Sequence, residues 1–396
     1  MVASIAELVG ENRPVIQKAI DLTLAEMSAT GAMYRQGFFD PALRPFIASN
    51  SYPDRDLAWM RIKEFRPRVG HIRGTDGEVL TDRNKVEISL DELGSINVSD
   101  GVTWVEEDYL RLNKMIQLQE RMANAVGVYD ALLNTFLQPA RDLAVGIEQT
   151  WLLMALRCVT LGDPNYTDPR SGVTYSVDYT GLVPAGNLAA ALTGSNVWSN
   201  LANANGIDDL VAHLDVYYAN LLRFPEAIAM SRATMNNLCS QASSKILVAR
   251  NKGLITDGAV IADAANLPKP TPEEIRDVIQ NQVITTNSGM PVPQFIITDG
   301  VYYNAAGTPT PFLPADYYVF LNSNMVEAAK VPTMLEIRSQ ITGQSMPESF
   351  GNGFTIVAKA EDSVPIRDYV KVDTAGMIIC PDPRLIAARN VEDTAV

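Results

Sequence analysis

A long amphipathic helix ending at Gly162 constrains this fold more than any other feature of the sequence. Glu148 and Arg157 interrupt its apolar character, which argues against a membrane span. Pro139 is placed in the first turn, where proline is tolerated, so the predicted helix is roughly 33 Å long at about 1.5 Å per residue. Its apolar face is formed by residues spaced three or four apart: Leu143, Ile147, Trp151, Met154, Cys158 and Leu161.

An alternating run of residues, Val173–Tyr179, follows this helix closely. Strict alternation places successive side chains on opposite faces, so the run predicts a two-faced strand. A helix of this length that leads into such a strand is typical of a scaffold and favours a structural protein. An ordinary core helix in another α+β protein is the alternative interpretation.

Composition limits the classes of function. The 396 residues are enough for a substantial core and two or three substructures, and 47% apolar with 20% charged residues is typical of globular proteins. The formal net charge of −14 argues against a dedicated nucleic-acid-binding module, because phosphates require Lys and Arg. Residues 1–8 do not resemble a signal peptide, and the distant cysteines Cys158, Cys239 and Cys380 are expected to be reduced and buried.

Helical spacing recurs along the chain. Residues 4–30 and the apolar stripe from Leu112 to Val126 predict two helices, and Ile207–Leu221 predicts a third with excellent regularity. A further helix is expected to begin at Thr271, because Pro272 suits the first turn and Glu274 completes a capping box.

Short β-rich segments occupy the C-terminal part. Turn residues separate them. Earlier in the chain, residues 182–206, between the alternating run and the helix at 207–221, are predicted to be loop with short helical pieces. The sum is an α+β architecture. The predicted strands are Phe295–Thr298, Tyr317–Leu321, Phe354–Val357 and Met377–Ile379.

The segment before this helical region divides into an arm and a charged loop. Residues 37–56 contain three prolines and are expected to form an extended arm rather than a core element. Residues 61–90 predict a polar hairpin around a turn at Gly74–Gly77, too poor in apolar residues to be stable alone. The first part of this loop contains five basic residues and one acidic residue, so it is positively charged while the whole chain is acidic. The loop is therefore expected to dock on an acidic face of a neighbouring copy. A solvated loop without a partner is the alternative.

Signatures of catalysis and metal binding are missing from the sequence. His71 and His213 are the only histidines, no Gly-x-Ser-x-Gly turn accompanies them, and both are expected to be structural. Neither a phosphate-binding loop, nor a His-Glu-x-x-His helix, nor a calcium loop is present. An enzyme would need a site assembled from unrelated loops.

The order of these features resembles the tailed-phage major capsid proteins of the Hong Kong 97-type fold, in particular the lambda-like major capsid protein E family. The similarity is a loose pattern over nearly the whole chain, and the order of its weak matches carries the weight. The matching segments are Glu148–Gly162, Gly172–Tyr179, Trp198, Met230–Leu238, Tyr302–Gly307, Leu313–Pro314 and Met377–Pro381.

The resemblance implies an architecture and a function. It places an N-terminal arm at 1–55, an extended loop at 56–101, a peripheral domain with the long helix as its spine at 102–190 and 350–380, and an axial domain at 191–349 and 381–396. The expected function is that of a viral major capsid protein that self-assembles into hexamers and pentamers of an icosahedral shell around the phage genome. No enzymatic activity, cofactor or metal is expected.

Partners and contacts follow from the same resemblance. Other copies, scaffolding, portal and decoration proteins are expected as partners; double-stranded DNA is enclosed without sequence-specific binding, no membrane is involved, and shells assemble in the host cytoplasm and end in the virion. Lys85 lies where some members form a Lys-to-Asn crosslink, but lambda-like relatives rely on decoration proteins, so no crosslink is expected. The candidate inter-subunit residues are Arg61, Lys63, Arg66, Arg68, Arg73 and Lys85.

Two other functions compete with this one. An encapsulin-like compartment shares the fold and encloses an enzyme cargo, although this chain is longer than expected for that group. A soluble α+β enzyme with an unrecognised site would form no large assembly.

Overall fold

A computed structural model of the chain shows an α+β fold. Inside several helices and strands only the backbone is described. The described residues are 41–43, 45–51, 58–64, 87–92, 96–105, 107–108, 110–111, 114, 128–168, 172–255, 264, 266–284, 293–303, 308–333, 349–350, 354–361 and 367–392. The predicted helix at 4–30 therefore lies outside them, as does nearly all of the stripe at 112–126.

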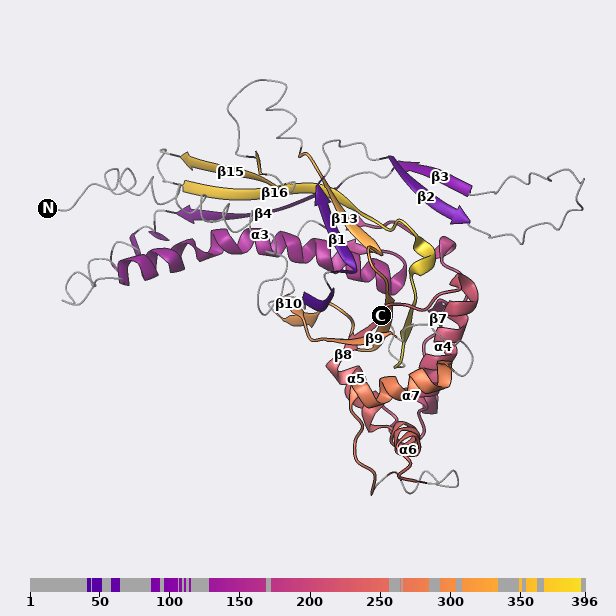
Figure 1. Ribbon diagram of the computed structural model, residues 1–396. Coiled ribbons are helices and arrows are strands. Elements are labelled where there is room, and N and C mark those ends of the chain that lie inside the picture. Colours follow the sequence, from indigo (N-terminus) through magenta and orange to yellow (C-terminus); the bar gives the residue numbers. More distant parts are fainter. Residues whose placement is uncertain are drawn as a thin grey trace, which may run out of the picture.

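Helix α3 (Val128–Leu161) is the longest element and lies along a sheet (Figure 1). Its 34 residues span about 50 Å. The expected start at Pro139 is wrong, because the helix begins at Val128 and the proline lies in its interior. The predicted end is confirmed: Gly162 has a φ of 76° and its amide donates to the Cys158 carbonyl oxygen at 2.8 Å.

The sheet beside α3 has six strands, centred on the 13-residue β16 (Arg367–Ile379). Strand β16 pairs antiparallel with three neighbours, so it is covered at both edges along most of its length. We call this sheet together with α3 the spine layer. The other strands are β1 (Ile47–Ser51), β4 (Ile96–Val105), β13 (Val326–Val331), β14 (Ser349–Phe350) and β15 (Phe354–Glu361).

Part of the expected arm belongs to the core of the spine layer. Strand β1 pairs in parallel with β13, and Leu43, Phe46 and Ile47 are buried before and within it. The prediction that residues 37–56 form no core element is therefore wrong. None of the three prolines of this segment lies within the strand, so they remove no hydrogen bond from the sheet. Pro41 opens a short 3-10 helix before it (η2, Pro41–Leu43).

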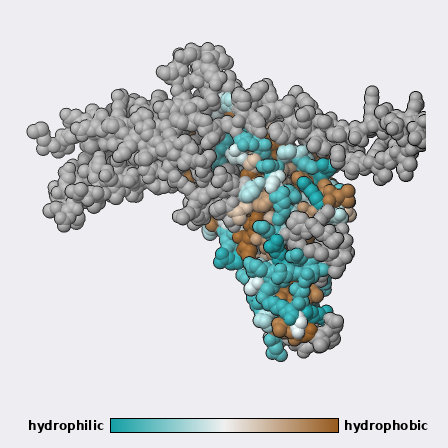
Figure 2. Space-filling view, viewed as in Figure 1, coloured by the Kyte–Doolittle hydropathy of each residue, from teal (hydrophilic) through white to brown (hydrophobic). Residues whose placement is uncertain are grey.

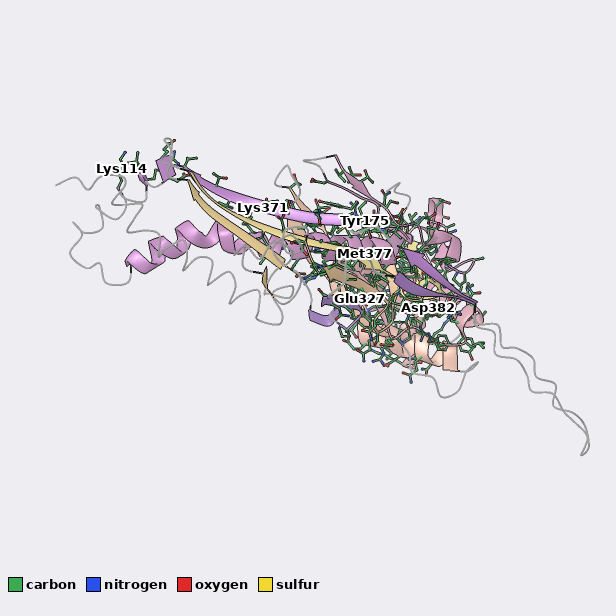
Figure 3. The ribbon with its side chains drawn as sticks, turned by 90° about the horizontal axis from the view of Figure 1, so that it is seen from above. Lys114, Tyr175, Glu327, Lys371, Met377 and Asp382 are labelled. Atoms are coloured by element: carbon green, nitrogen blue, oxygen red, sulfur yellow. The ribbon has the colours of Figure 1, made fainter. Side chains whose placement is uncertain are left out.

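The alternating run after α3 forms less strand than predicted. Only β6 (Thr174–Tyr175) is paired, with β5 (Tyr166–Thr167). Its alternation nevertheless buries two aromatic side chains, because the hydroxyl of Tyr175 accepts from the Ile378 amide at 3.0 Å and Tyr179 donates to the Ile378 carbonyl at 3.1 Å. Figure 3 shows Tyr175 over the part of the spine layer that holds Met377.

A second unit extends away from the spine layer near the C-terminal end of α3 (Figure 1). We call it the five-stranded unit, after its sheet of order β7-β17-β12-β8-β9. Helix α4 confirms the prediction for 207–221, and α7 confirms the capping box: the Thr271 amide donates to Glu274 at 2.9 Å and the Glu274 amide to Thr271 Oγ1 at 3.3 Å. The elements are β7 (Leu188–Ala189), α4 (Gly206–Leu221), β8 (Ala227–Ser231), α5 (Arg232–Ser240), α6 (Ala242–Asn251), α7 (Pro272–Ile284), β9 (Gln294–Thr298), β12 (Tyr317–Leu321) and β17 (Ala388–Asn390).

The four predicted C-terminal strands are confirmed, three of them as parts of longer strands. The predicted loop at 182–206 is also confirmed, because within it only β7 and short 3-10 turns are ordered as secondary structure (η3, Thr180–Leu182; η4, Gly194–Asn196). Two buried apolar clusters hold the molecule together. The first surrounds α3 and includes side chains of both the spine layer and the five-stranded sheet, such as Val319 and Leu321. The second lies between α4 and the five-stranded sheet.

Candidate subunit-contact surfaces

The basic loop begins in a two-stranded hairpin. Strand β2 (Ala58–Glu64) pairs antiparallel with β3 (Glu87–Glu92), which confirms that the two arms of the predicted hairpin pair. The turn predicted at Gly74–Gly77 lies outside the described residues. In Figure 1 the hairpin lies beyond the end of the six-stranded sheet, opposite to the side where β4 and β15 end. An isolated two-stranded hairpin is at best marginally stable, so this one requires packing against other structure.

Two of the six candidate contact residues fall in this hairpin. Arg61 and Lys63 both lie on β2, where the pairing register shifts between Ile62 and Glu64. Arg66, Arg68, Arg73 and Lys85 lie outside the described residues, so their role in subunit contacts stays a prediction.

A buried ion pair joins α3 to the sheet of the spine layer. The ammonium of Lys330 on β13 contacts a carboxylate oxygen of Glu148, and the residues are 2% and 7% exposed. On the opposite face of β13, Glu327 accepts from the Asn50 amide at 2.9 Å. Because Glu327 and Lys330 interrupt its apolar pattern, β13 does not look like a buried strand in the sequence, although all six of its residues are buried.

His213 lies at the centre of the five-stranded unit. Its Nε2 is 2.9 Å from the Asn187 carbonyl oxygen, which can only accept, so Nε2 carries the proton and Nδ1 accepts from the Tyr318 hydroxyl at 2.9 Å. Burial lowers the pKa of the imidazole to about 4. The prediction that this histidine is structural is confirmed, because both nitrogens are used and the side chain is 3% exposed. His71 lies outside the described residues.

Gln241 fixes the irregular segment before α4. Its Oε1 accepts from the Gly206 amide at 2.8 Å, while Trp198 from the same segment donates from Nε1 to Asp209 at 3.2 Å. Gly206 allows this close approach: a Cβ there would lie 2.6 Å from Gln241 Oε1. The segment is thus held rigidly although it has little regular structure.

The face of the five-stranded unit seen in Figure 2 is mainly polar, with apolar areas among the polar residues. Leu254 after α6 is 61% exposed and Leu222 after α4 is 62% exposed. Single exposed apolar residues of this kind are common on monomers, but in an assembly they are available for contacts.

The described residues contain neither a metal-ion cluster nor a membrane-spanning helix. Among the described residues, His, Cys, Asp and Glu form no group able to hold a metal ion. Within the described part of the chain, no helix is both long and apolar enough to cross a membrane. All three cysteines are buried and form no disulfide, as predicted, and burial raises the pKa of Cys239 to about 11.

Comparisons with known proteins were made for both sequence and fold. No protein-family model matches the sequence, and no curated protein matches it. A protein assigned as the capsid protein of a prophage of Escherichia coli CFT073 has a similar structure, with 15% identity and a TM-score of 0.51 over 93% of this chain and 98% of that one.

Two further solved structures are similar at lower scores. A phage-related protein from Bordetella bronchiseptica RB50 gives 10% identity and a TM-score of 0.47, over 94% of this chain and 96% of that one. An encapsulin complex from Synechococcus elongatus PCC 7942 gives 11% identity and a TM-score of 0.39, over 87% of this chain and 85% of that one. The likeness to the prophage protein, over nearly the full length of both chains, assigns this chain the Hong Kong 97-type capsid fold.

Proposed function

We propose that this chain is a phage major capsid protein, which self-assembles into the hexamers and pentamers of an icosahedral shell around a double-stranded DNA genome. The observation that carries the proposal is the shared fold with the prophage capsid protein over 93% of this chain. The role is structural and not enzymatic, and the final location is the virion after assembly in the host cytoplasm.

The division of labour within the subunit follows the same proposal. The spine layer corresponds to the peripheral domain (102–190 and 350–380), and the five-stranded unit to the axial domain (191–349 and 381–396) near the capsomer centre. Several strands cross these bounds. Strand β13 lies within the axial range but pairs with β16 of the spine layer, and β1 and most of β4 also belong to that layer although they lie before residue 102. Strand β7 lies within the peripheral range but belongs to the five-stranded sheet. Residues 1–55 would be the arm and 56–101 the extended loop.

The charge distribution supports docking between copies. A closed ring needs head-to-tail contacts, so each copy must carry a projecting element and a surface that receives it. The hairpin β2–β3 begins a basic loop, while the whole chain carries a formal charge of −14. Polar contacts of this kind set register and specificity more than affinity.

The lambda-like branch is a finer proposal, supported by the order of sequence features. It implies that decoration proteins, rather than a crosslink through Lys85, reinforce the shell, and that scaffolding and portal proteins take part in assembly. Mass spectrometry of denatured shells tests the crosslink: subunits of monomer mass are expected, whereas a covalent ladder would refute this part.

Electron microscopy of the recombinant full-length chain after size-exclusion chromatography tests the function. Closed shells, tubes or hexameric and pentameric rings are expected. Shells that co-purify with a specific enzyme inside would instead establish the encapsulin-like compartment. A uniform monomer or small oligomer, with and without the products of neighbouring genes, would refute the shell function.

A charge-reversal variant tests the docking loop. Arg66, Arg68 and Arg73 changed together to Glu should leave a folded chain that fails to form shells. The matched control changes the same three residues to Lys, which keeps the charge and should keep assembly. Normal shells from the Glu variant would refute the docking role and leave the shell function intact.

A further inference from the structure

Three buried polar atoms without a hydrogen-bond partner occur in the spine layer. They are Oε2 of Glu148, Nε1 of Trp151 and Oγ1 of Thr374. Glu148 is 7% exposed and the other two residues are fully buried. An unsatisfied buried polar atom is unfavourable, so three on facing elements require an explanation.

Helix spacing, strand register and strand alternation place the three residues on the facing surfaces of α3 and the sheet. Glu148 and Trp151 are three residues apart and therefore neighbours on one face of the helix. Across from them, Gly376 pairs in register with Lys330, whose ammonium contacts Glu148. Thr374 is two residues from Gly376 on β16 and so points to the same face of the sheet.

Gly376 brings the indole ring against the strand. A Cβ at this position would lie 3.2 Å from Trp151 Cη2 and 2.5 Å from the Ala329 carbonyl oxygen. The missing side chain thus leaves room for the ring against β16. The pair Lys330–Glu148 uses only one carboxylate oxygen, Oε1, and the second oxygen remains for another donor.

We propose that an ordered water molecule is bound between α3 and β16 by Glu148, Trp151 and Thr374. The donors and acceptors match water: the indole N–H donates to it, and its two hydrogens are donated to the Glu148 carboxylate and the Thr374 hydroxyl. Three hydrogen bonds are typical of a buried water. A cation does not fit, because the indole N–H and the Lys330 ammonium both present positive charge.

The water gives the spine layer a bridge that does not depend on direct side-chain contact. It would link the long helix to the central strand beside the buried ion pair, and the two together would fix where α3 lies along the sheet. This inference concerns the single chain and is independent of whether shells form.

A substitution at Thr374 tests the proposal by the sign of its effect. Thr374→Val has nearly the same shape but no hydroxyl. If the hydroxyl holds water, the opening equilibrium of β16, measured by amide hydrogen exchange over 371–379, should rise about fivefold, as for one lost hydrogen bond. If the hydroxyl is merely buried without a partner, the variant should be neutral or more protected, and the proposal is overturned.

Two controls and a direct observation complete the test. Thr374→Ser keeps the hydroxyl and should change the exchange less than Val does. Thr160→Val removes a buried hydroxyl that donates to the Leu156 carbonyl at 2.7 Å, which calibrates the loss of one satisfied bond. A density map of the wild-type chain that resolves ordered waters should show one beside these three atoms; an empty site there would refute the proposal even if the Val variant failed to fold.

Discussion

His213 offers a quantitative prediction about pH. The imidazole is 3% exposed, and burial lowers its pKa from 6.5 to about 4, with the positive charge of Arg389 acting in the same direction. The hydrogen bond to Asn187 opposes this shift but is the smaller effect. In the unfolded chain the imidazole regains its ordinary pKa, so acid protonates the unfolded state first.

The sign and size of the effect follow from these two values. Because the folded pKa of this base is depressed, the stabilisation is fully present above about pH 6.5 and is lost as the pH falls toward 4. Between pH 8 and pH 5 the free energy of unfolding should fall by about 2 kcal/mol through this one residue, and by about 3 kcal/mol once the pH is well below 4.

The assay compares wild type with His213→Gln in urea denaturation of the unassembled chain at pH 5 and pH 8. Glutamine does not titrate but can still donate to Asn187 and accept from Tyr318. Asp208 and Asp209, whose pKa values burial raises, titrate in both proteins and cancel in the difference. Wild type should lose about 2 kcal/mol more than the variant over this range.

A direct titration checks the same reasoning. The chain has only two histidines, so the NMR spectrum of a histidine-labelled sample holds two imidazole sets, and His71→Gln assigns them. A signal of His213 that titrates near pH 6.5 would refute the buried neutral imidazole, as would equal pH dependence of wild type and variant in urea.

Other substitutions give effects of known sign. Lys330→Met alone should destabilise the chain by about 3–5 kcal/mol, because it leaves the Glu148 carboxylate buried without its cationic partner. Lys330→Met combined with Glu148→Leu should cost far less, and equal losses in urea denaturation would refute the coupling. Gly206→Ala should cost about 1–3 kcal/mol in thermal unfolding, since its Cβ would lie 2.5 Å from Leu238 Cδ1, whereas Gly181→Ala, with nothing within 4 Å, should be close to neutral. Thr271→Ala should destabilise α7 by about 1 kcal/mol and speed its amide exchange, while unchanged exchange would show that the capping box contributes nothing.

The elements predicted well from sequence are those with local signals. Helix α4 follows from its apolar spacing and α7 from its capping box, and both signals lie within the segment itself. Helix α3 was predicted too short because a proline is most common in a first turn, whereas here the packing of the C-terminal part on the sheet sustains a helix that continues through Pro139.

Elements stabilised by distant partners were missed. Strand β13 contains Glu327 and Lys330, which are buried only because Asn50 and Glu148 come from other elements to meet them. Most of β16 was missed for a similar reason, since Asp373 is buried on a central strand beside Lys371. The candidate contact surface was predicted as a hairpin, but how its basic residues meet a partner depends on a second chain that no sequence pattern contains.

The pairing of β1 with β13 has a consequence for synthesis on the ribosome. Ile47 lies beside Val326, and Ile96 of β4 beside Gly376, so the earliest strands of the spine layer wait for partners made hundreds of residues later. Until then their edges and the apolar side chains around Phe46 have no native cover in this sheet. Such nonlocal pairing is slow and exposes the nascent chain to misassociation. We therefore expect the yield of folded protein in cells to depend on chaperones that bind the chain during translation.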